Sequence, residues 1–309
     1  MTQVAVIGAG LIGRAWSIVF ARAGFDVLLW DPVAKQVEAA LSFIGERLPE
    51  LEQAGLLKEP AQLVVRRVRP VDTLAAAVGS AEHVQENGPE RVEAKQALFA
   101  ELDRLARRDA VLASSTSGIP ASAFTEALPG RARCLVAHPV NPPYLVPLVE
   151  LCPAPWTDPA TVSRTRALMT SAGQVPATVN KEMAGFALNR LQGALLAEAF
   201  RLIDDDVISP TDLDALVKHG LGLRWSFMGP LETIDLNAPG GLKDYCERYG
   251  PLYAQLQREM TPRTWGPALI DRLQAARRAE LPANMQPVRQ EWRDRRLMAL
   301  LAHKATQPE

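Results

Sequence analysis

The sequence predicts an α/β fold, with a doubly wound and mostly parallel sheet, followed by a second, all-helical domain. Over residues 1–182, short apolar runs alternate with amphipathic helical patterns, as in sheets whose parallel strands are joined by helices. After Lys181 the alternation stops, and only helical patterns follow. We therefore expect a sheet domain over 1–182 and a helical domain over 183–309.

Length and composition indicate the class of protein. At 309 residues the chain exceeds the usual size of one domain, and its 48% apolar and 22% charged residues are typical of soluble globular proteins. The net charge is −1 with both signs interspersed, which argues against binding to nucleic acid or to an anionic membrane. No apolar run reaches the ~18 residues of a membrane span, and no secretion signal precedes the first strand. We expect a cytoplasmic protein.

The three cysteines, Cys134, Cys152 and Cys246, lie far apart and form no C-x-x-C pair. Structural zinc sites and disulfide frameworks show closer or paired spacings. We therefore expect neither a metal site nor disulfide bonds, which fits a reducing compartment.

The first predicted strand, residues 3–7, is followed at once by the letters GAGLIG and then by a helical pattern. Gly8 permits a tight turn, Gly10 lets a pyrophosphate approach the backbone, and Gly13 lets the helix pack close to the strand. Phosphate then lies at the helix N-terminus, which carries partial positive charge. A lone G-x-G-x-x-G is a weak signal, but the order of strand, glycine turn and helix predicts a dinucleotide-binding fold of the Rossmann type.

A second strand is expected at 26–30, and Asp31 closes it, eighteen residues after Gly13. A carboxylate at this place accepts hydrogen bonds from ribose hydroxyls and repels a 2′-phosphate. The pattern therefore favours NAD over NADP, although Lys35 lies close by. The alternative is a helix start that binds nothing, with Asp31 in an ordinary turn.

The remaining elements follow from the apolar pattern. In the first domain, further strands are expected at 64–65, 83–85, 110–113, 134–137, 145–151 and 174–179. Helical patterns between them cover 33–54, 75–78, 90–106 and 159–172. In the second domain, helical patterns cover 183–206, 210–220 behind the N-cap Ser209, 242–260, 265–280 and 286–303.

Two of the predicted strands lead into polar side chains. The strand at 110–113 is followed by the cluster SSTSG, residues 114–118, and the strand at 134–137 is followed by His138. The carboxyl ends of parallel strands meet at one edge of an open α/β sheet, where ligands bind. We therefore expect the SSTSG cluster and His138 at the same edge.

The segment from His138 to Glu150, HPVNPPYLVPLVE, predicts a pair of catalytic side chains. Three prolines stiffen the loop after His138, and the apolar run at 145–151 predicts a buried strand that brings the chain back. Glu150 can then hydrogen-bond one imidazole nitrogen, fix its tautomer and leave the other nitrogen to take a substrate proton. The alternative is a structural histidine at a strand end beside a surface glutamate.

With these motifs the chain resembles the 3-hydroxyacyl-CoA dehydrogenase superfamily, most closely its lambda-crystallin / L-gulonate 3-dehydrogenase group. The strings that carry the resemblance span nearly the whole chain: VAVIGAGLIGRAW, SSTSG, AHPVNPPYLVPLVELCP, KEMAGFALNRLQ and GLGLRWSFMGPLETIDLNAPGG. HPVNPP stands where the acyl-CoA enzymes have His-aromatic-aromatic-Asn-Pro. Together with the last two strings, this difference points to the gulonate-type branch.

The resemblance implies a Rossmann domain with a helical C-terminal domain, NAD as the cofactor, a homodimer, and reversible oxidation of a secondary alcohol. It implies that His138 and Glu150 form the catalytic dyad and that Ser117 and Asn189 hydrogen-bond the reacting oxygen. The positions that match NAD contacts of the family are Leu11, Ile12, Asp31, Glu90 and Lys95.

Several of these residues also have a structural alternative. Ser117 can cap the start of a helix, and Asn189 can cross-link two helices. Glu90 and Lys95 can be charged residues of a solvated helix face.

Arg224, in the string GLRWSF, is the candidate anchor for the substrate. A guanidinium can hold a carboxylate through two parallel hydrogen bonds, so Arg224 favours a small 3-hydroxy acid such as L-gulonate over a CoA thioester. The alternative is that Arg224 is only an exposed arginine, or one whose side chain covers the core, with no role in substrate binding. Three other functions stay open: a 3-hydroxyacyl-CoA (3-hydroxybutyryl-CoA) dehydrogenase, a carnitine dehydrogenase, and a non-enzymatic NAD-binding structural or sensor protein.

Overall fold

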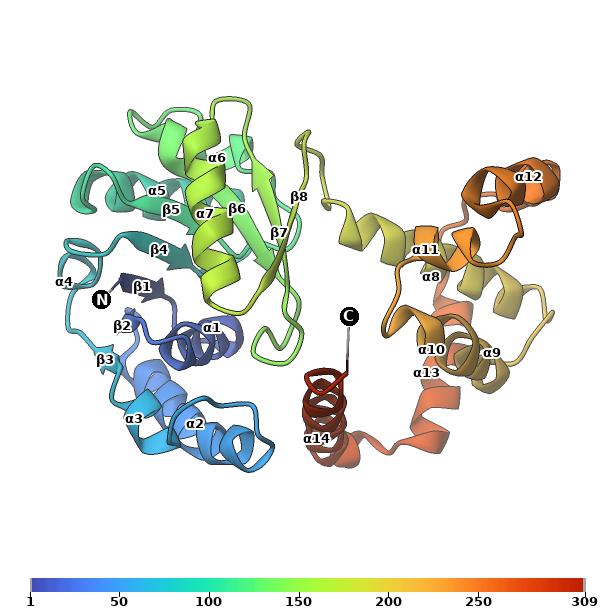
Figure 1. The fold of residues 1–309 in the computed structure, drawn as a ribbon, viewed down its shortest axis with the longest axis horizontal. Helices are drawn as coiled ribbons and strands as arrows, with labels where there is room; N and C mark the ends of the chain where they lie inside the picture. Colours follow the sequence, from blue (N-terminus) through green and yellow to red (C-terminus); the bar gives the residue numbers. More distant parts are fainter. Residues whose placement is uncertain (1, 308–309) are drawn as a thin grey trace. The chain divides into compact units, whose positions relative to one another are not determined.

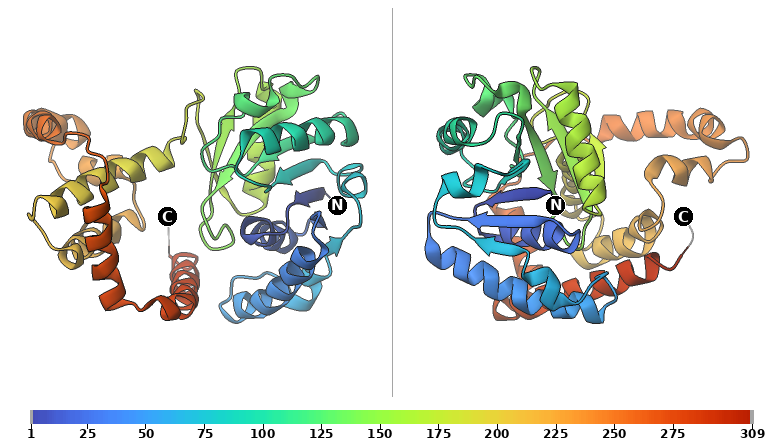
Figure 2. Two further views of the ribbon diagram at one scale, coloured as in Figure 1. Left: turned by 180° about the vertical axis from the view of Figure 1, so that it is seen from behind. Right: turned by 60° about the vertical axis from the view of Figure 1, so that its left-hand side comes forward.

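The computed structural model describes residues 2–307. The chain divides into two compact units: the first holds the residues up to Asn189 together with those from Gln290 onwards, and the second holds Arg190–Arg289. The first unit contains the sheet, and the second is built from helices (Figures 1 and 2). None of the described helices is both long and apolar enough to cross a membrane.

An eight-stranded sheet forms the centre of the first unit, in the order β3-β2-β1-β4-β5-β6-β7-β8 (Figure 1). Its strands are β1 (Gln3–Ile7), β2 (Asp26–Trp30), β3 (Val68–Pro70), β4 (His83–Glu86), β5 (Val111–Ser114), β6 (Cys134–Pro139), β7 (Leu148–Pro153) and β8 (Val175–Thr178). Every neighbouring pair is parallel except β6 and β7, which are antiparallel. The predicted doubly wound, mostly parallel sheet is therefore confirmed.

Helices cover both faces of this sheet. They are α1 (Leu11–Arg22), α2 (Ala34–Gln53), α3 (Ala61–Val65), α4 (Leu74–Val78), α5 (Val92–Leu105), α6 (Ser122–Thr125), η1 (Arg131–Arg133), α7 (Pro159–Ser171) and most of α14 (Gln286–Lys304). Along β1, Val4 and Val6 join a core with α1, α2, α7 and α14, whereas Ala5 and Ile7 join a second core with α4, α5 and α6. Successive side chains of a strand point to opposite faces, so the two cores lie on the two sides of the sheet.

The second unit is helical, as predicted. Its elements are most of α8 (Leu188–Asp204), then α9 (Pro210–Leu216), η2 (Val217–Leu221), α10 (Gly222–Trp225), α11 (Pro230–Asp235), α12 (Gly241–Glu259), α13 (Pro267–Glu280) and η3 (Ala283–Met285). Ser209 caps α9 as expected, because its hydroxyl accepts a hydrogen bond from the Asp212 amide at 3.1 Å.

Three local predictions are wrong. The helix predicted over 183–206 begins only at Leu188, because residues 184–187 form a turn in which Phe186 has a φ of +52°. Residues 64–65, predicted as a strand, end the helix α3, and the next strand is β3 instead. Two apolar residues are too few to distinguish a helical from a strand period. The helix predicted over 210–220 does not end at Gly220, because the chain continues through the π-helical turn η2 directly into α10.

The C-terminal helix α14 packs on the sheet unit. Its Met298 is 4% exposed and belongs to the core that also contains Val4 and Val6. The Tyr144 hydroxyl lies 3.3 Å from Asp294 Oδ2 of the same helix. The helical pattern predicted α14, but an amphipathic pattern shows only which face is buried and not what covers it.

We expect Met298→Ala to lower the free energy of unfolding by about 2–4 kcal/mol, because it removes a buried side chain and leaves a cavity. Met285→Ala is the matched control, since Met285 is 42% exposed and its truncation leaves no cavity. Urea unfolding followed by circular dichroism measures both variants. Equal stability of the two would show that α14 does not depend on this core.

Candidate active site

The glycine turn joins β1 to α1, and its geometry requires glycine at two positions. Gly8 has a φ of +91°, and a Cβ on Gly13 would lie 1.8 Å from the Gly8 carbonyl oxygen. At Gly10 a Cβ would meet no atom within 4 Å, so the backbone before α1 borders open space. The exposed Leu11 begins the helix, and Ile12 packs against the core. Unpaired amides at a helix start make such a space a cradle for phosphate.

Asp31 lies beside this turn. Its Oδ2 accepts a hydrogen bond from the Ala9 amide at 2.8 Å, and its Oδ1 accepts one from the Val33 amide at 2.9 Å. Each carboxylate oxygen keeps a further lone pair. The fold therefore brings a hydrogen-bond acceptor for a ribose next to a cradle for a pyrophosphate, which is the donor and acceptor set that a dinucleotide needs.

His138 and Glu150 are brought together by the one antiparallel pairing of the sheet, where they stand opposite each other in the register of β6 and β7. The His138 Nδ1 lies 2.9 Å from Glu150 Oε2. The two residues are 7% and 3% exposed. No described residue hydrogen-bonds the second ring nitrogen, Nε2, so this atom is left for a ligand.

The other oxygen of Glu150 contacts the start of α8. Glu150 Oε1 accepts hydrogen bonds from the amides of Ala187 and Leu188 at 2.9 and 2.8 Å. Just before these amides, the buried Phe186 has a φ of +52°, and its ring centroid lies 5.5 Å from that of His138. Burial raises the pKa of the Glu150 carboxyl, but the hydrogen bonds from His138 and both amides outweigh it and hold the pKa below its usual 4.5. Glu150 is thus a charged acceptor.

Glu90 holds the SSTSG cluster that follows β5. Its Oε1 accepts hydrogen bonds from the Thr116 hydroxyl at 2.6 Å, the Ser117 amide at 2.9 Å and the Ser117 hydroxyl at 3.1 Å. Burial raises the pKa of Glu90, but Thr116, Lys95 and Ser117 together hold it below its usual 4.5. Asn189 Nδ2 donates to the Ser117 carbonyl at 2.6 Å. Ser117, Asn189 and Glu90 therefore form one hydrogen-bonded group.

Lys95 is enclosed and does not belong to a solvated helix face. Its side chain is 1% exposed, and its Nζ lies 3.0 and 3.1 Å from the two carboxylate oxygens of Glu86. The Glu90 Oε2 lies 3.8 Å from the same Nζ. The alternative of a solvated charge is therefore wrong for Lys95.

A family model described as "3-hydroxyacyl-CoA dehydrogenase, NAD binding domain" matches residues 3–183, and the model of the C-terminal domain of that family matches residues 185–280. The chain belongs to the 3-hydroxyacyl-CoA dehydrogenase family. It is an NAD-dependent oxidoreductase that acts on CH–OH groups. The glycine turn and Asp31 fit this cofactor. The predicted family, fold and cofactor are thus confirmed.

The relatives of this dehydrogenase have names that point to different substrates. The chain is 45% identical to the lambda-crystallin homolog of Bos taurus over 311 residues, which are 99% of this chain and 97% of the relative. It is 37% identical to an L-carnitine dehydrogenase of a Pseudomonas species over 248 residues, 80% of this chain and 76% of the relative. A solved NAD⁺-dependent dismutase, 5-formyl-3-hydroxy-2-methylpyridine 4-carboxylic acid 5-dehydrogenase, is 28% identical with a TM-score of 0.85, covering 100% of both chains.

Sequence reasoning missed Glu86, which lies fully buried at the end of β4. Its Oε2 accepts a hydrogen bond from the Ser114 hydroxyl at 2.5 Å, and its Oε1 accepts one from the Gly88 amide at 2.6 Å. The available signal was an acidic residue at the end of a short strand, nine residues before a lysine on the following helix.

A second missed group surrounds Ser115. Its hydroxyl accepts from Trp16 Nε1 at 3.0 Å and from Gln85 Nε2 at 2.7 Å, and it donates to Asn87 Oδ1 at 2.8 Å. The Gln85 Oε1 lies 3.0 Å from Nε2 of His83, whose burial lowers its pKa to about 4. His83 is therefore neutral at ordinary pH and serves this internal network. No local sequence pattern marks these contacts.

Arg224 lies in the second unit, in α10, directly after the π-helical turn η2. Its side chain is exposed, and no acidic side chain among the described residues forms an ion pair with it. π-Helical turns are frequent at functional sites. Among the residues that the structure describes, this exposed guanidinium has no carboxylate partner, which is the state that a substrate anchor needs.

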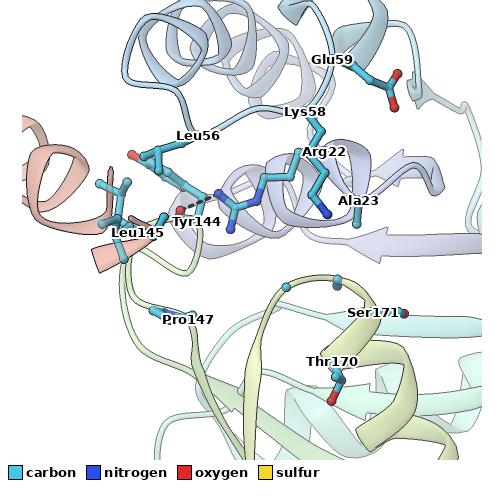
Figure 3. A pocket seen from close by; sticks show the side chains of 14 residues that line it. Arg22, Ala23, Leu56, Lys58, Glu59, Tyr144, Leu145, Pro147, Thr170 and Ser171 are labelled. Atoms are coloured by element: carbon cyan, nitrogen blue, oxygen red, sulfur yellow. Dashed lines mark hydrogen bonds between the residues drawn. The ribbon is translucent and has the colours of Figure 1, made fainter. Parts of the chain in front are cut away.

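A cavity of about 450 Å³ in the first unit lies elsewhere on this dehydrogenase (Figure 3). Arg22 and Tyr144 are among its lining residues, and Arg22 Nη1 donates to the Tyr144 carbonyl at 2.8 Å. Neither His138, Glu150 nor any residue of the glycine turn lines it. The cavity is therefore not part of the candidate active site.

Proposed function

We propose that this enzyme oxidises the 3-hydroxyl group of a small, L-gulonate-like hydroxy acid with NAD. In this proposal His138 is the general base, and Glu150 orients His138 and stabilises its protonated form. The observation that carries this proposal is the 2.9 Å contact between His138 Nδ1 and Glu150 Oε2. A histidine oriented by a carboxylate through one nitrogen presents the other nitrogen to the substrate.

In the proposed reaction, His138 Nε2 accepts the proton of the substrate hydroxyl as the carbonyl forms. Glu150, which is held charged by the amides of Ala187 and Leu188, stabilises the imidazolium that results. Bound NAD supplies the acceptor for the hydrogen that leaves the carbon as hydride. In the reverse direction His138 returns the proton to the oxygen.

We assign Ser117 and Asn189 to the reacting oxygen. The Ser117 hydroxyl makes one of four hydrogen bonds to Glu90 Oε1, at 3.1 Å. The others come from the Thr116 hydroxyl at 2.6 Å, the Ser117 amide at 2.9 Å and the Gly118 amide at 3.3 Å. This hydroxyl can therefore turn to a substrate without leaving Glu90 unsatisfied. The side-chain amide of Asn189 donates one hydrogen to the Ser117 carbonyl, and its second hydrogen can be donated to the substrate.

For the cofactor, we propose that the glycine turn holds the pyrophosphate and that Asp31 holds the adenosine ribose. The open space at Gly10 and the position of Asp31 beside Ala9 support this assignment. The residues proposed for the NAD site are Gly8, Gly10, Leu11, Ile12, Gly13, Asp31, Glu90 and Lys95.

His138→Gln should lower kcat for alcohol oxidation by about 10²- to 10⁴-fold, because the substrate proton then lacks its base. NAD affinity should stay unchanged, since the glycine turn is untouched. NADH absorbance gives kcat, and a fluorescence titration gives NAD affinity. His303→Gln, at an exposed histidine near the end of α14, is the matched control. Turnover of the His138 variant close to that of the wild type would remove the assignment.

The proposed substrate class depends on Arg224 and on the relatives. An unpaired guanidinium binds a carboxylate through two parallel hydrogen bonds, and a small hydroxy acid offers one. The 45% identity to a lambda-crystallin homolog supports the gulonate-type assignment. The 37% identity to an L-carnitine dehydrogenase makes L-carnitine the second candidate substrate.

We expect L-gulonate to give the highest kcat/KM in an NADH assay that also contains L-3-hydroxybutyrate, L-carnitine and L-3-hydroxybutyryl-CoA. Arg224→Met should raise KM for L-gulonate by about tenfold or more with little change in kcat, because it removes a charge-assisted contact that binding uses.

Arg258→Met provides the matched control, since Arg258 is exposed and its guanidinium bonds only the Ala254 carbonyl of its own helix among the described contacts. An unchanged KM for L-gulonate in Arg224→Met would rule out this anchor. A preference of the wild type for the CoA thioester would overturn the proposed substrate class.

We further propose a homodimer in the cytoplasm, with residues 1–182 as the NAD-binding part. Of the predicted second domain, 183–309, we propose Arg190–Arg289 for substrate binding and dimerisation, because the residues from Gln290 onwards belong to the sheet unit. Several large apolar side chains of the second unit are exposed, which supports an interface between subunits. They include Leu216, Leu223, Phe227, Leu231 and Leu236. The free cysteines Cys134, Cys152 and Cys246 suit a reducing compartment.

A further inference from the structure

The cavity of about 450 Å³ in the first unit is separate from the candidate active site and has walls of its own (Figure 3). Segments far apart in the chain form these walls: the end of α1, the loop between α2 and α3, the loop between β6 and β7, and the ends of α7 and α14. Its volume lies in the range of pockets that hold small molecules. The cavity is therefore large enough for a small organic ligand.

Arg22 is a cation of this cavity that lacks a counter-charge. Its Nη1 donates to the Tyr144 carbonyl at 2.8 Å, but no described acidic side chain forms an ion pair with it. Burial lowers the pKa of the Arg22 guanidinium to about 10. A partly buried charge is costly unless it is paired, and a guanidinium has further N–H groups to donate. An anion in the cavity would therefore stabilise Arg22.

A second cation lines the same cavity. Lys58 forms no ion pair with the acidic side chains that the structure describes, and in Figure 3 it approaches from the same side as Arg22. Glu59 is the one acidic residue among the lining residues, and its Oε2 lies 2.6 Å from Arg67 Nη2, which neutralises it. The cavity thus carries net positive charge, which favours an anionic ligand.

Much of the remaining wall is apolar. Leu56, Leu145 and Leu301 line it, and Leu145 is 2% exposed. Tyr144 also lines the cavity, but its hydroxyl lies 3.3 Å from Asp294 Oδ2 and is thereby already paired. An inorganic anion would leave the apolar walls in contact with water, whereas a ligand with an apolar body removes them from it. The lining therefore suits a ligand that combines an anionic head with an apolar body.

We propose that this cavity binds a small organic acid, with its carboxylate on Arg22 and Lys58 and its apolar body against the leucines of the wall. A guanidinium matches a carboxylate through two parallel hydrogen bonds, and the lysine ammonium adds a second positive charge. None of the residues assigned to NAD or to the hydroxy acid substrate lines the cavity. The inference therefore goes beyond the proposed function and does not depend on it.

The test is isothermal titration calorimetry with octanoate on the whole chain saturated with NADH. We expect octanoate to bind at millimolar concentration or below. Octanol lacks the charge and acetate lacks the apolar body, so each should bind at least about tenfold more weakly. Binding of octanol or acetate as strong as that of octanoate would contradict the proposed recognition, and the absence of octanoate binding would overturn it.

Arg22→Met should weaken octanoate binding by about tenfold or more, because it removes the paired hydrogen bonds to the carboxylate. Arg66→Met is the matched control, since Arg66 is an exposed arginine of the same unit that does not line the cavity. This control should bind octanoate as the wild type does. Equal Kd values in the two variants would remove Arg22 from the site.

Lys58→Gln tests the site even if Arg22→Met does not fold, because Lys58 is exposed and has no described ion pair to lose. It should weaken octanoate binding by about two- to fivefold, the effect of one exposed charge, and an unchanged Kd would contradict the role of Lys58. Arg224→Met should bind octanoate as the wild type does. If this variant loses the binding while Arg22→Met keeps it, octanoate occupies the proposed substrate site, and the inference is wrong. The proposed function is tested separately by the kcat of His138→Gln.

Discussion

The structure depends above all on the antiparallel pairing of β6 with β7. In a sheet whose other pairings are parallel, this one reversal sets Glu150 opposite His138 and places the start of α8 against the same carboxylate. A shift of the register by a single residue would turn one of the two side chains to the other face of the sheet. Only the observed register brings the two side chains face to face, as the proposed proton transfer by His138 requires.

Carboxylates that accept backbone N–H groups recur in the candidate site. Asp31 binds the amide of Ala9 in the glycine turn, Glu150 binds the first amides of α8, and Glu90 binds the amides of the SSTSG loop. Hydrogen bonds of this kind favour the charged form and also fix the segment that donates them. In this enzyme the same acidic side chains therefore set the electrostatics and the geometry of the site.

The parts of the fold with local signals could be predicted from the sequence. The letters GAGLIG and the apolar runs that lead to the SSTSG cluster and to His138 each form a recognisable pattern. The prolines and the apolar run between His138 and Glu150 predicted a chain that folds back. The contacts of Glu86 and Met298 could not be predicted, because they depend on which distant segment comes alongside. A resemblance supplied the roles of Ser117 and Asn189, which local patterns do not reveal.

The most direct test of the central claim is kcat for alcohol oxidation at neutral pH in the wild type and in Glu150→Gln. The pKa of Glu150 is held below its usual 4.5, so the carboxylate is charged throughout the neutral range and can stabilise the imidazolium that forms when His138 takes the substrate proton. Glu150→Gln removes that charge and keeps a side chain of similar size. The account predicts that kcat falls by at least about tenfold while NAD affinity stays unchanged. A variant that keeps the kcat of the wild type would contradict it.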